Sequence, residues 1–157
     1  MSREPLVIVI RVRGASGMAA EAERVLRLLN LKKANHAIIL PLNQSTRGML
    51  RQVHAYVTWG EASPEILAKL LKRGDPLPGV KVEEELKKLG VKNLEELSVK
   101  IANSEVDLSV LEKMFKPIFR LHPPRGGFKG SIKRPAVQDG VLGYAGERIS
   151  RLIEVMS

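Results

Sequence analysis

The chain has 157 residues, 44% of them hydrophobic, and carries a formal net charge of +9 with a sequence pI of about 10.0. This length and apolar content predict one folded domain with a hydrophobic core and room for an appendage. The lack of cysteine excludes disulfides, zinc ribbons and thiol chemistry, and the lack of a long apolar run argues against a membrane span.

The N-terminal segment predicts a strand. MSREPLVIVIRVRG places charges before and inside a short apolar run, which favours a strand over a signal peptide. The lack of cysteine agrees with the reducing cytoplasm that we expect as the location. One face of this strand becomes cationic towards its end, at Arg11 and Arg13. Like charges on one face of a sheet are costly unless they meet water or an anion, so both are candidate contacts to a polyanion.

The first sixty residues alternate between strands and helices. The expected elements are a strand at 6–13, a helix at 18–30, a strand at 36–40, a helix capped by Ser45 or Thr46, and a strand at 56–59. Arg47 and Arg51 lie four residues apart and therefore share one face of the second helix. Trp59 is the single tryptophan; core packing is its default role, and base stacking is the alternative.

The remaining residues predict a largely helical part. Ser63 as a cap, Pro64 in the first turn and Gly74 at the end delimit one helix. Shorter helical patterns follow at 82–89, 94–102 and 108–114, the apolar run 115–121 could add an edge strand, and a last amphipathic helix is expected at 146–156.

The positive charge is concentrated at the two ends of the chain. Residues 1–60 carry nine basic and three acidic groups, residues 61–115 carry nine and eleven, and residues 116–157 carry eight and three. Segregated positive charge of this kind is typical of a protein that binds a polyanion.

The stretch RLHPPRGGFKGSIKRP, residues 120–135, has five cations and no acid. Its prolines favour extended backbone and its glycines allow close approach to an irregular surface, so we interpret it as a basic arm for phosphates. A flexible basic linker is the alternative that composition leaves open. Its candidate RNA-binding residues are Arg120, His122, Arg125, Lys129, Lys133 and Arg134.

Signatures of enzymes and metal sites are absent from the sequence. The three histidines have neither two-histidine helical spacing nor a nearby acidic pair, and GASGM lacks the Lys-Ser/Thr of a phosphate-binding loop. Ser16 and Ser45 have no plausible His–Asp setting. We therefore expect no catalysis, no metal and no cofactor.

The order of apolar and basic residues resembles a known family. The spacing Val25-Leu26, Leu29, Leu31, Lys33, His36, Ile38, then Met49-Leu50, Val53 and Tyr56-Val57 is similar to the signature of large-subunit ribosomal protein L thirty. LKKANHAIILPLNQSTRGML and RLHPPRGGFKGSIKRP resemble its longer archaeal form, which is similar to the eukaryotic protein L seven.

The resemblance implies an α+β fold: a βαβαβ ferredoxin-like core at 1–60, with a three-stranded antiparallel sheet and two packed helices. The extension at 61–157 would comprise a helical part at 63–114, the basic arm at 120–135 and the C-terminal helix. Strand–helix–strand order alone suggests parallel neighbours instead.

The resemblance also implies a structural role in the large ribosomal subunit. The expected partners are large-subunit ribosomal RNA, neighbouring ribosomal proteins and a place near the 5S RNA. It adds Lys32, Lys33, Asn35, Arg47 and Gly48 to the RNA-binding candidates, beside Arg11, Arg13, Arg51 and the arm.

Two other functions remain open from the sequence. A non-ribosomal RNA-binding or ribosome-assembly factor would carry the same cations. A ferredoxin-like ligand-sensing module would need a second strand–helix–strand half or a glycine-lined pocket, and neither pattern is visible.

Overall fold

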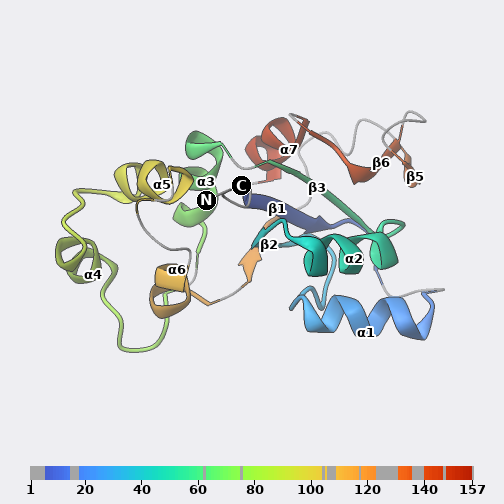
Figure 1. Ribbon diagram of the computed structural model, residues 1–157, viewed down its shortest axis with the longest axis horizontal. Coiled ribbons are helices and arrows are strands. Elements are labelled where there is room, and N and C mark those ends of the chain that lie inside the picture. Colours follow the sequence, from blue (N-terminus) through green and yellow to red (C-terminus); the bar gives the residue numbers. More distant parts are fainter. Residues whose placement is uncertain are drawn as a thin grey trace.

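The computed structural model (Figure 1) describes residues 6–14, 18–61, 63–74, 76–103, 105, 109–116, 118–122, 131–135, 140–146 and 148–156, and at 112, 131–135, 140 and 141 it describes the backbone alone. The elements are β1 (Leu6–Arg11), α1 (Ala20–Leu28), β2 (His36–Pro41), α2 (Gln44–Val53), β3 (Val57–Glu61), α3 (Pro64–Lys72), α4 (Val82–Lys88), α5 (Leu94–Ala102), α6 (Ser109–Met114), β4 (Phe119–Arg120), β5 (Ser131–Pro135), β6 (Gly140–Tyr144) and α7 (Arg148–Met156).

The fold is mixed α+β around one sheet with the strand order β4-β2-β1-β3-β6-β5. β1 pairs antiparallel with β2, where Ile8 faces Ile39, and with β3, where Ile8 faces Gly60. The antiparallel arrangement implied by the family resemblance is therefore right, and the parallel one suggested by element order is wrong.

The expectation of a three-stranded sheet is also wrong, because strands from the second half of the chain extend it at both edges. β4 pairs with the start of β2, as the apolar run before Leu121 predicted, and β6 pairs parallel with β3. Burial drives both additions: Phe119 and Leu142 are 4% and 3% exposed. The strand at Gly140–Tyr144 has a weak apolar pattern, GVLGY, and was not predicted.

Both faces of the sheet are covered, which explains why β1 is apolar at successive positions rather than at alternate ones. Val7 and Val9 pack against α1 and α2, whereas Ile8 and Ile10 pack against helices of the second half. In Figure 1, α1 and α2 lie below the strands, α7 lies above them, α3 lies at their left-hand end, and α4–α6 extend the molecule farther to the left.

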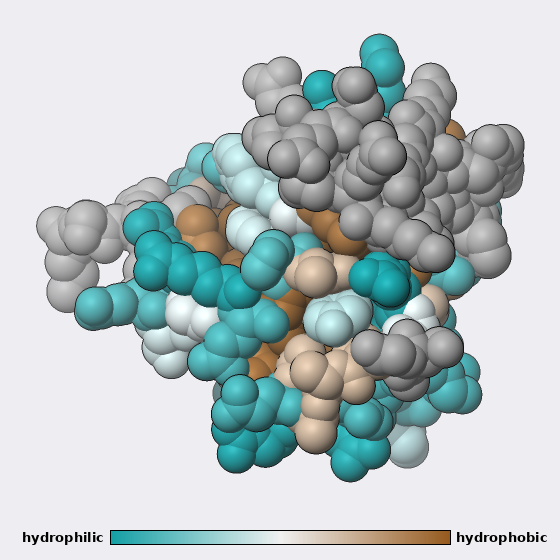
Figure 2. Space-filling view, turned by 90° about the vertical axis from the view of Figure 1, so that its right-hand side faces the viewer, coloured by the Kyte–Doolittle hydropathy of each residue, from teal (hydrophilic) through white to brown (hydrophobic). Residues whose placement is uncertain are grey.

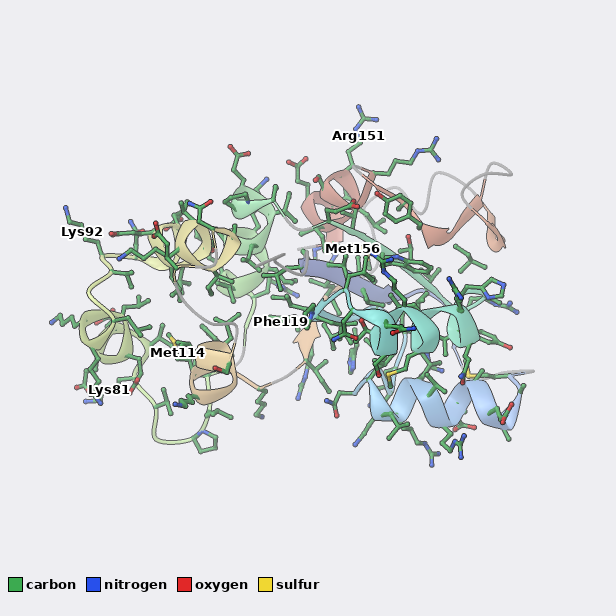
Figure 3. The ribbon with its side chains drawn as sticks, in the orientation of Figure 1. Lys81, Lys92, Met114, Phe119, Arg151 and Met156 are labelled. Carbon is green, nitrogen blue, oxygen red and sulfur yellow. The ribbon has the colours of Figure 1, made fainter. Side chains whose placement is uncertain are left out.

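The larger core lies between the sheet and the helices α3–α7. Met114, Phe119 and Met156, labelled in Figure 3, are buried in it. Gly60 lets α7 approach β3, because a Cβ at this position would clash with the backbone oxygen of Gly146 and lie 2.7 Å from Cγ2 of Ile149. The two halves of the chain therefore share one sheet and this larger core.

Local signals set the helix ends. Asn30 follows α1 in the left-handed region with φ of 64°, a conformation that commonly ends helices. α2 is capped by Asn43 and not by Ser45 or Thr46, because the Asn43 side chain accepts from the Thr46 amide at 2.9 Å while Thr46 Oγ1 accepts from the Asn43 amide at 2.9 Å. This reciprocal pair is a capping box. Ser63 caps α3 as predicted.

No helix in the described ranges is long and apolar enough to cross a membrane.

Candidate nucleic-acid interface

Three basic segments that are distant in sequence meet at one end of the sheet. Here β1 ends at Arg11, β2 begins at His36, and β4 places Arg120 opposite His36. The Asn35 amide donates to the Arg11 carbonyl at 2.7 Å, and the Leu121 amide donates to the Asn35 carbonyl at 3.1 Å. We call this region the basic end and define it by Arg11, Arg13, Lys32, Lys33, His36 and Arg120.

Arg11 is the buried member of the basic end. The residue is 3% exposed, and its guanidinium donates from Nη1 to the Leu31 carbonyl and from Nε to the Arg13 carbonyl, both at 2.8 Å. Burial lowers the pKa of Arg11, and the Glu23 carboxylate opposes that shift. The strand pattern predicted an anion or water as the partner of this cation, but backbone carbonyls fill that role. Arg11 therefore holds the turn before β2 instead of facing outwards.

Arg13 lies nearer the surface and is held by an aromatic ring. Its guanidinium carbon is 5.4 Å from the centroid of the Tyr56 ring, and Nη1 donates to the Ala55 carbonyl at 3.4 Å. A cation over a ring face is attracted by the ring's quadrupole, which restricts the side chain while leaving donors for a ligand. Arg13 is therefore a fixed charge at the rim of the basic end.

The turn before β2 presents two exposed lysines. Lys32 and Lys33 are both exposed. Asn35 adopts the left-handed conformation with φ of 67°, which asparagine tolerates better than most residues. This conformation turns the chain from the exposed lysines into the buried start of β2, so Asn35 has a structural role at the position where the sequence predicted an RNA contact.

The pKa of His36 is lowered in the folded protein, by burial and in part by the neighbouring cations of the basic end. Burial lowers its pKa most, and Arg120, Lys33 and Arg11 lower it further. Within the described part of the chain, Nδ1 of His36 is buried and has no hydrogen-bond partner. A neutral imidazole is therefore favoured here, because a further positive charge would be added to cations that already lie close together. The sequence had shown this histidine only as part of the family signature.

Arg47 and Arg51 are exposed on α2. The end of this helix adjoins the basic end, since the Tyr56 carbonyl accepts from the amides of Val12 at 2.9 Å and Arg13 at 3.3 Å. Gly48 lies between the two arginines, and a Cβ there would meet nothing within 4 Å. The helix surface beside the two charges is therefore open to a close neighbour.

The predicted basic arm begins and ends in strands at opposite edges of the sheet. Arg120 lies in β4, where its carbonyl accepts from Nη2 of Arg73 at 3.1 Å, and the His122 amide donates to the Met156 carbonyl at 3.0 Å. Lys133 and Arg134 lie in β5, at the other edge. Arg125 and Lys129 lie outside the described residues. The last five residues of the predicted arm form β5, and residues 123–130 lie outside the described residues.

Charged and polar side chains also cover much of the surface. Figure 2 shows hydrophilic residues in teal around a smaller apolar area on the side of the molecule that is at the right of Figure 1. In the ranges that the structure describes, no group of three or more His, Asp or Glu is placed to hold a metal ion. The exposed cations of the basic end are suited to electrostatic binding of an anion.

A small α+β domain with a cluster of cations at one end of its sheet is typical of a nucleic-acid-binding protein. The model of the family described as ribosomal protein L30p/L7e matches residues 7–57. The large ribosomal subunit protein uL30 of Desulfurococcus amylolyticus is 41% identical over 158 residues, which cover 96% of this chain and 98% of the relative. The uL30 proteins of Thermofilum pendens and Ignicoccus hospitalis are each 43% identical, over 94% of this chain and 96% and 95% of their own lengths.

This similarity runs through both halves of the chain, the extension included. The chain belongs to the ribosomal protein L30p/L7e family.

Proposed function

We propose that this chain is a structural, non-enzymatic constituent of the large ribosomal subunit and that it binds ribosomal RNA through the basic end. The observation that carries the RNA-binding part is the convergence of Arg13, Lys32, Lys33 and Arg120 at one end of the sheet. Family membership supports the role in the large subunit, and the expected location is the cytoplasmic ribosome. The β1–β3 unit with α1 and α2 is proposed to be the ferredoxin-like core of the family.

The proposed mechanism is neutralisation of phosphates. Exposed Lys32 and Lys33 act as mobile point charges, whereas Arg13 is held over Tyr56 and offers directed donors. Each phosphate that is neutralised releases condensed counterions, so binding is favoured by entropy at low salt. Lysine and arginine contacts to the backbone fix the position of the protein without reading the base sequence.

The other predicted contacts extend this surface. Arg47 and Arg51 would follow the RNA along α2, with Gly48 allowing the backbone to come close. The cations of the 120–135 stretch would bind phosphates at both edges of the sheet, and the place near 5S RNA stays a prediction. The α3–α6 region, which has mixed charges, is proposed to face neighbouring ribosomal proteins.

Arg11 is proposed to act indirectly. Its hydrogen bond to the Leu31 carbonyl holds the turn that carries Lys32 and Lys33, so its removal would disturb their placement. This assigns Arg11 a positioning role in place of the RNA contact that the sequence predicted.

Cosedimentation tests the ribosomal part of the proposal. A tagged copy of the full chain, expressed in its source cells, should remain with large subunits through a high-salt wash that removes assembly factors. Loss of the chain in that wash would favour the assembly-factor alternative.

A matched pair of double variants tests the RNA surface. Lys32→Ala with Lys33→Ala should weaken binding to purified large-subunit RNA and make its salt dependence shallower. Lys81→Ala with Lys92→Ala removes the same charge from exposed positions in the α4 region, where Figure 3 shows both side chains extending away from the sheet. This control should bind like the parent; equal losses in both variants would mean that net charge, not the basic end, governs binding.

A further inference from the structure

An exposed aromatic side chain lies on β6, the strand next to the β5 edge of the sheet. Tyr144 in β6 is 53% exposed. It pairs with Trp59 across the β3–β6 ladder, and the two ring centroids are 6.4 Å apart with an angle of 55° between the planes. Trp59 packs at the margin of the core that contains α1 and α2. The two rings thus form one aromatic surface, with Trp59 partly buried and Tyr144 open to solvent.

The Tyr144 ring is fixed although it is exposed. Its hydroxyl donates to the Glu61 carboxylate, with oxygen–oxygen distances of 2.6 and 2.8 Å to Oε1 and Oε2. The ladder fixes the backbone at the same place, because the Ala145 amide donates to the Trp59 carbonyl at 2.7 Å. A ring held in this way loses little conformational entropy when a flat ligand stacks on it.

The residues around Tyr144 favour an RNA base, and not an apolar protein surface, as the ligand of this ring. In the described part of the chain, the other exposed large apolar side chains are Leu28 on α1 and Val99 on α5, so Tyr144 belongs to no apolar patch of the size that protein interfaces bury. A cation follows closely in the chain instead, because exposed Arg148 begins α7 four residues after Tyr144. The acid in contact with the ring, Glu61, is already bonded to the phenol.

We propose that Tyr144 and Trp59 form a stacking platform for an unpaired base of ribosomal RNA. The proposal rests on the function proposed above and adds a site that reads single-stranded RNA through stacking. An aromatic face accepts any base, while a phosphate beside that base would meet Arg148 at the start of α7. Trp59 supports the exposed ring from the side and makes the apolar surface larger than one ring.

Affinity measurements on the full chain separate stacking from charge. Tyr144→Ala should weaken binding to purified large-subunit RNA by roughly 5- to 150-fold, the range of one stacked base. The slope of log affinity against log salt should stay that of the parent, because no charge is removed. Tyr144→Phe keeps the ring and should bind within about threefold of the parent, since stacking needs only the π-face. Leu28→Ala, which truncates an exposed apolar residue elsewhere, should have no effect.

A photocrosslink in the assembled subunit gives a second reading that does not depend on stability. With a benzophenone amino acid replacing Tyr144, the crosslink should form to ribosomal RNA at an unpaired nucleotide. A crosslink to a neighbouring protein, or Tyr144→Ala binding as tightly as the parent, would overturn the platform while leaving the basic end intact. Failure of the proposed function would look different, because the parent itself would then bind the RNA weakly and without salt dependence.

Discussion

Replacing Arg11 with methionine tests whether this cation is structural. Methionine fills most of the space of the arginine stem but has no donors, so the carbonyls of Leu31 and Arg13 lose their 2.8 Å hydrogen bonds. Hydrogen bonds from a charged donor contribute about 1.5–3 kcal/mol each, and packing of the methionine offsets part of the loss. We expect the free energy of unfolding to fall by about 2–4 kcal/mol.

Thermal and urea unfolding measure this change directly. For a chain of this size the melting temperature should fall by about 5–15 °C. Arg11→Lys keeps the charge but not the forked donors, and it should be intermediate in stability. Arg13→Met is the matched control: its guanidinium lies nearer the surface and contacts one carbonyl at 3.4 Å, so it should be much less destabilising.

A parent-like melting temperature for Arg11→Met, together with a loss of RNA affinity, would refute this reasoning. That outcome would mean that Arg11 turns outwards and contacts a phosphate, as the strand pattern alone suggested. Equal destabilisation by Arg11→Met and Arg13→Met would also contradict the reasoning. It would mean that the buried position of Arg11 adds nothing to the free energy of unfolding.

Three further predictions concern the fold. Asn43→Ala should lower the free energy of unfolding by about 1 kcal/mol through loss of the α2 cap, with Ser45→Ala nearly neutral in the same urea titration. Gly60→Ala should lower the free energy of unfolding by about 1–3 kcal/mol, because α7 must move away from the new methyl group. Gly48→Ala places its methyl group in open space and should raise the free energy of unfolding by about 0.5–1 kcal/mol. Equal effects of the two substitutions would contradict the close approach of α7 to β3. The pKa of His36 is lowered below its ordinary 6.5 in the folded protein, so the unfolded chain binds the proton more readily. The stability that neutral His36 contributes is therefore present above pH 6.5 and is lost as the pH falls below that value. His36→Asn should therefore flatten the stability profile between pH 7 and 5, and an unchanged profile would count against the depressed pKa.

Much of the secondary structure could be predicted from the sequence because its signals are local. The β-branched run from Leu6, the Ser63 cap and the amphipathic pattern of the last helix each depend on residues close in the chain. The cap of α2 was missed because Asn43 precedes the more obvious Ser45 and Thr46. The strand at Gly140–Tyr144 was missed because two glycines interrupt its apolar pattern.

The candidate site was predictable in composition but not in geometry. Lys32, Lys33 and Arg120 were identified from charge and family resemblance, but only the sheet brings them together. The sequence could not show that the Leu31 carbonyl, twenty residues away, satisfies Arg11. Nor could it show Tyr144 beside Trp59, because that contact depends on a parallel pairing between strands from the two halves of the chain.

The salt dependence of binding to purified large-subunit ribosomal RNA tests the central claim most directly. With about six phosphate contacts, from Arg13, Lys32, Lys33 and Arg120 together with Arg47 and Arg51 on α2, the slope of log affinity against log salt concentration should be on the order of −4 to −5. Loss of the lysines at 32 and 33 should reduce the magnitude of that slope by about 1–2. A slope near zero for the parent protein would contradict the claim that cations at the basic end hold the RNA through its phosphates.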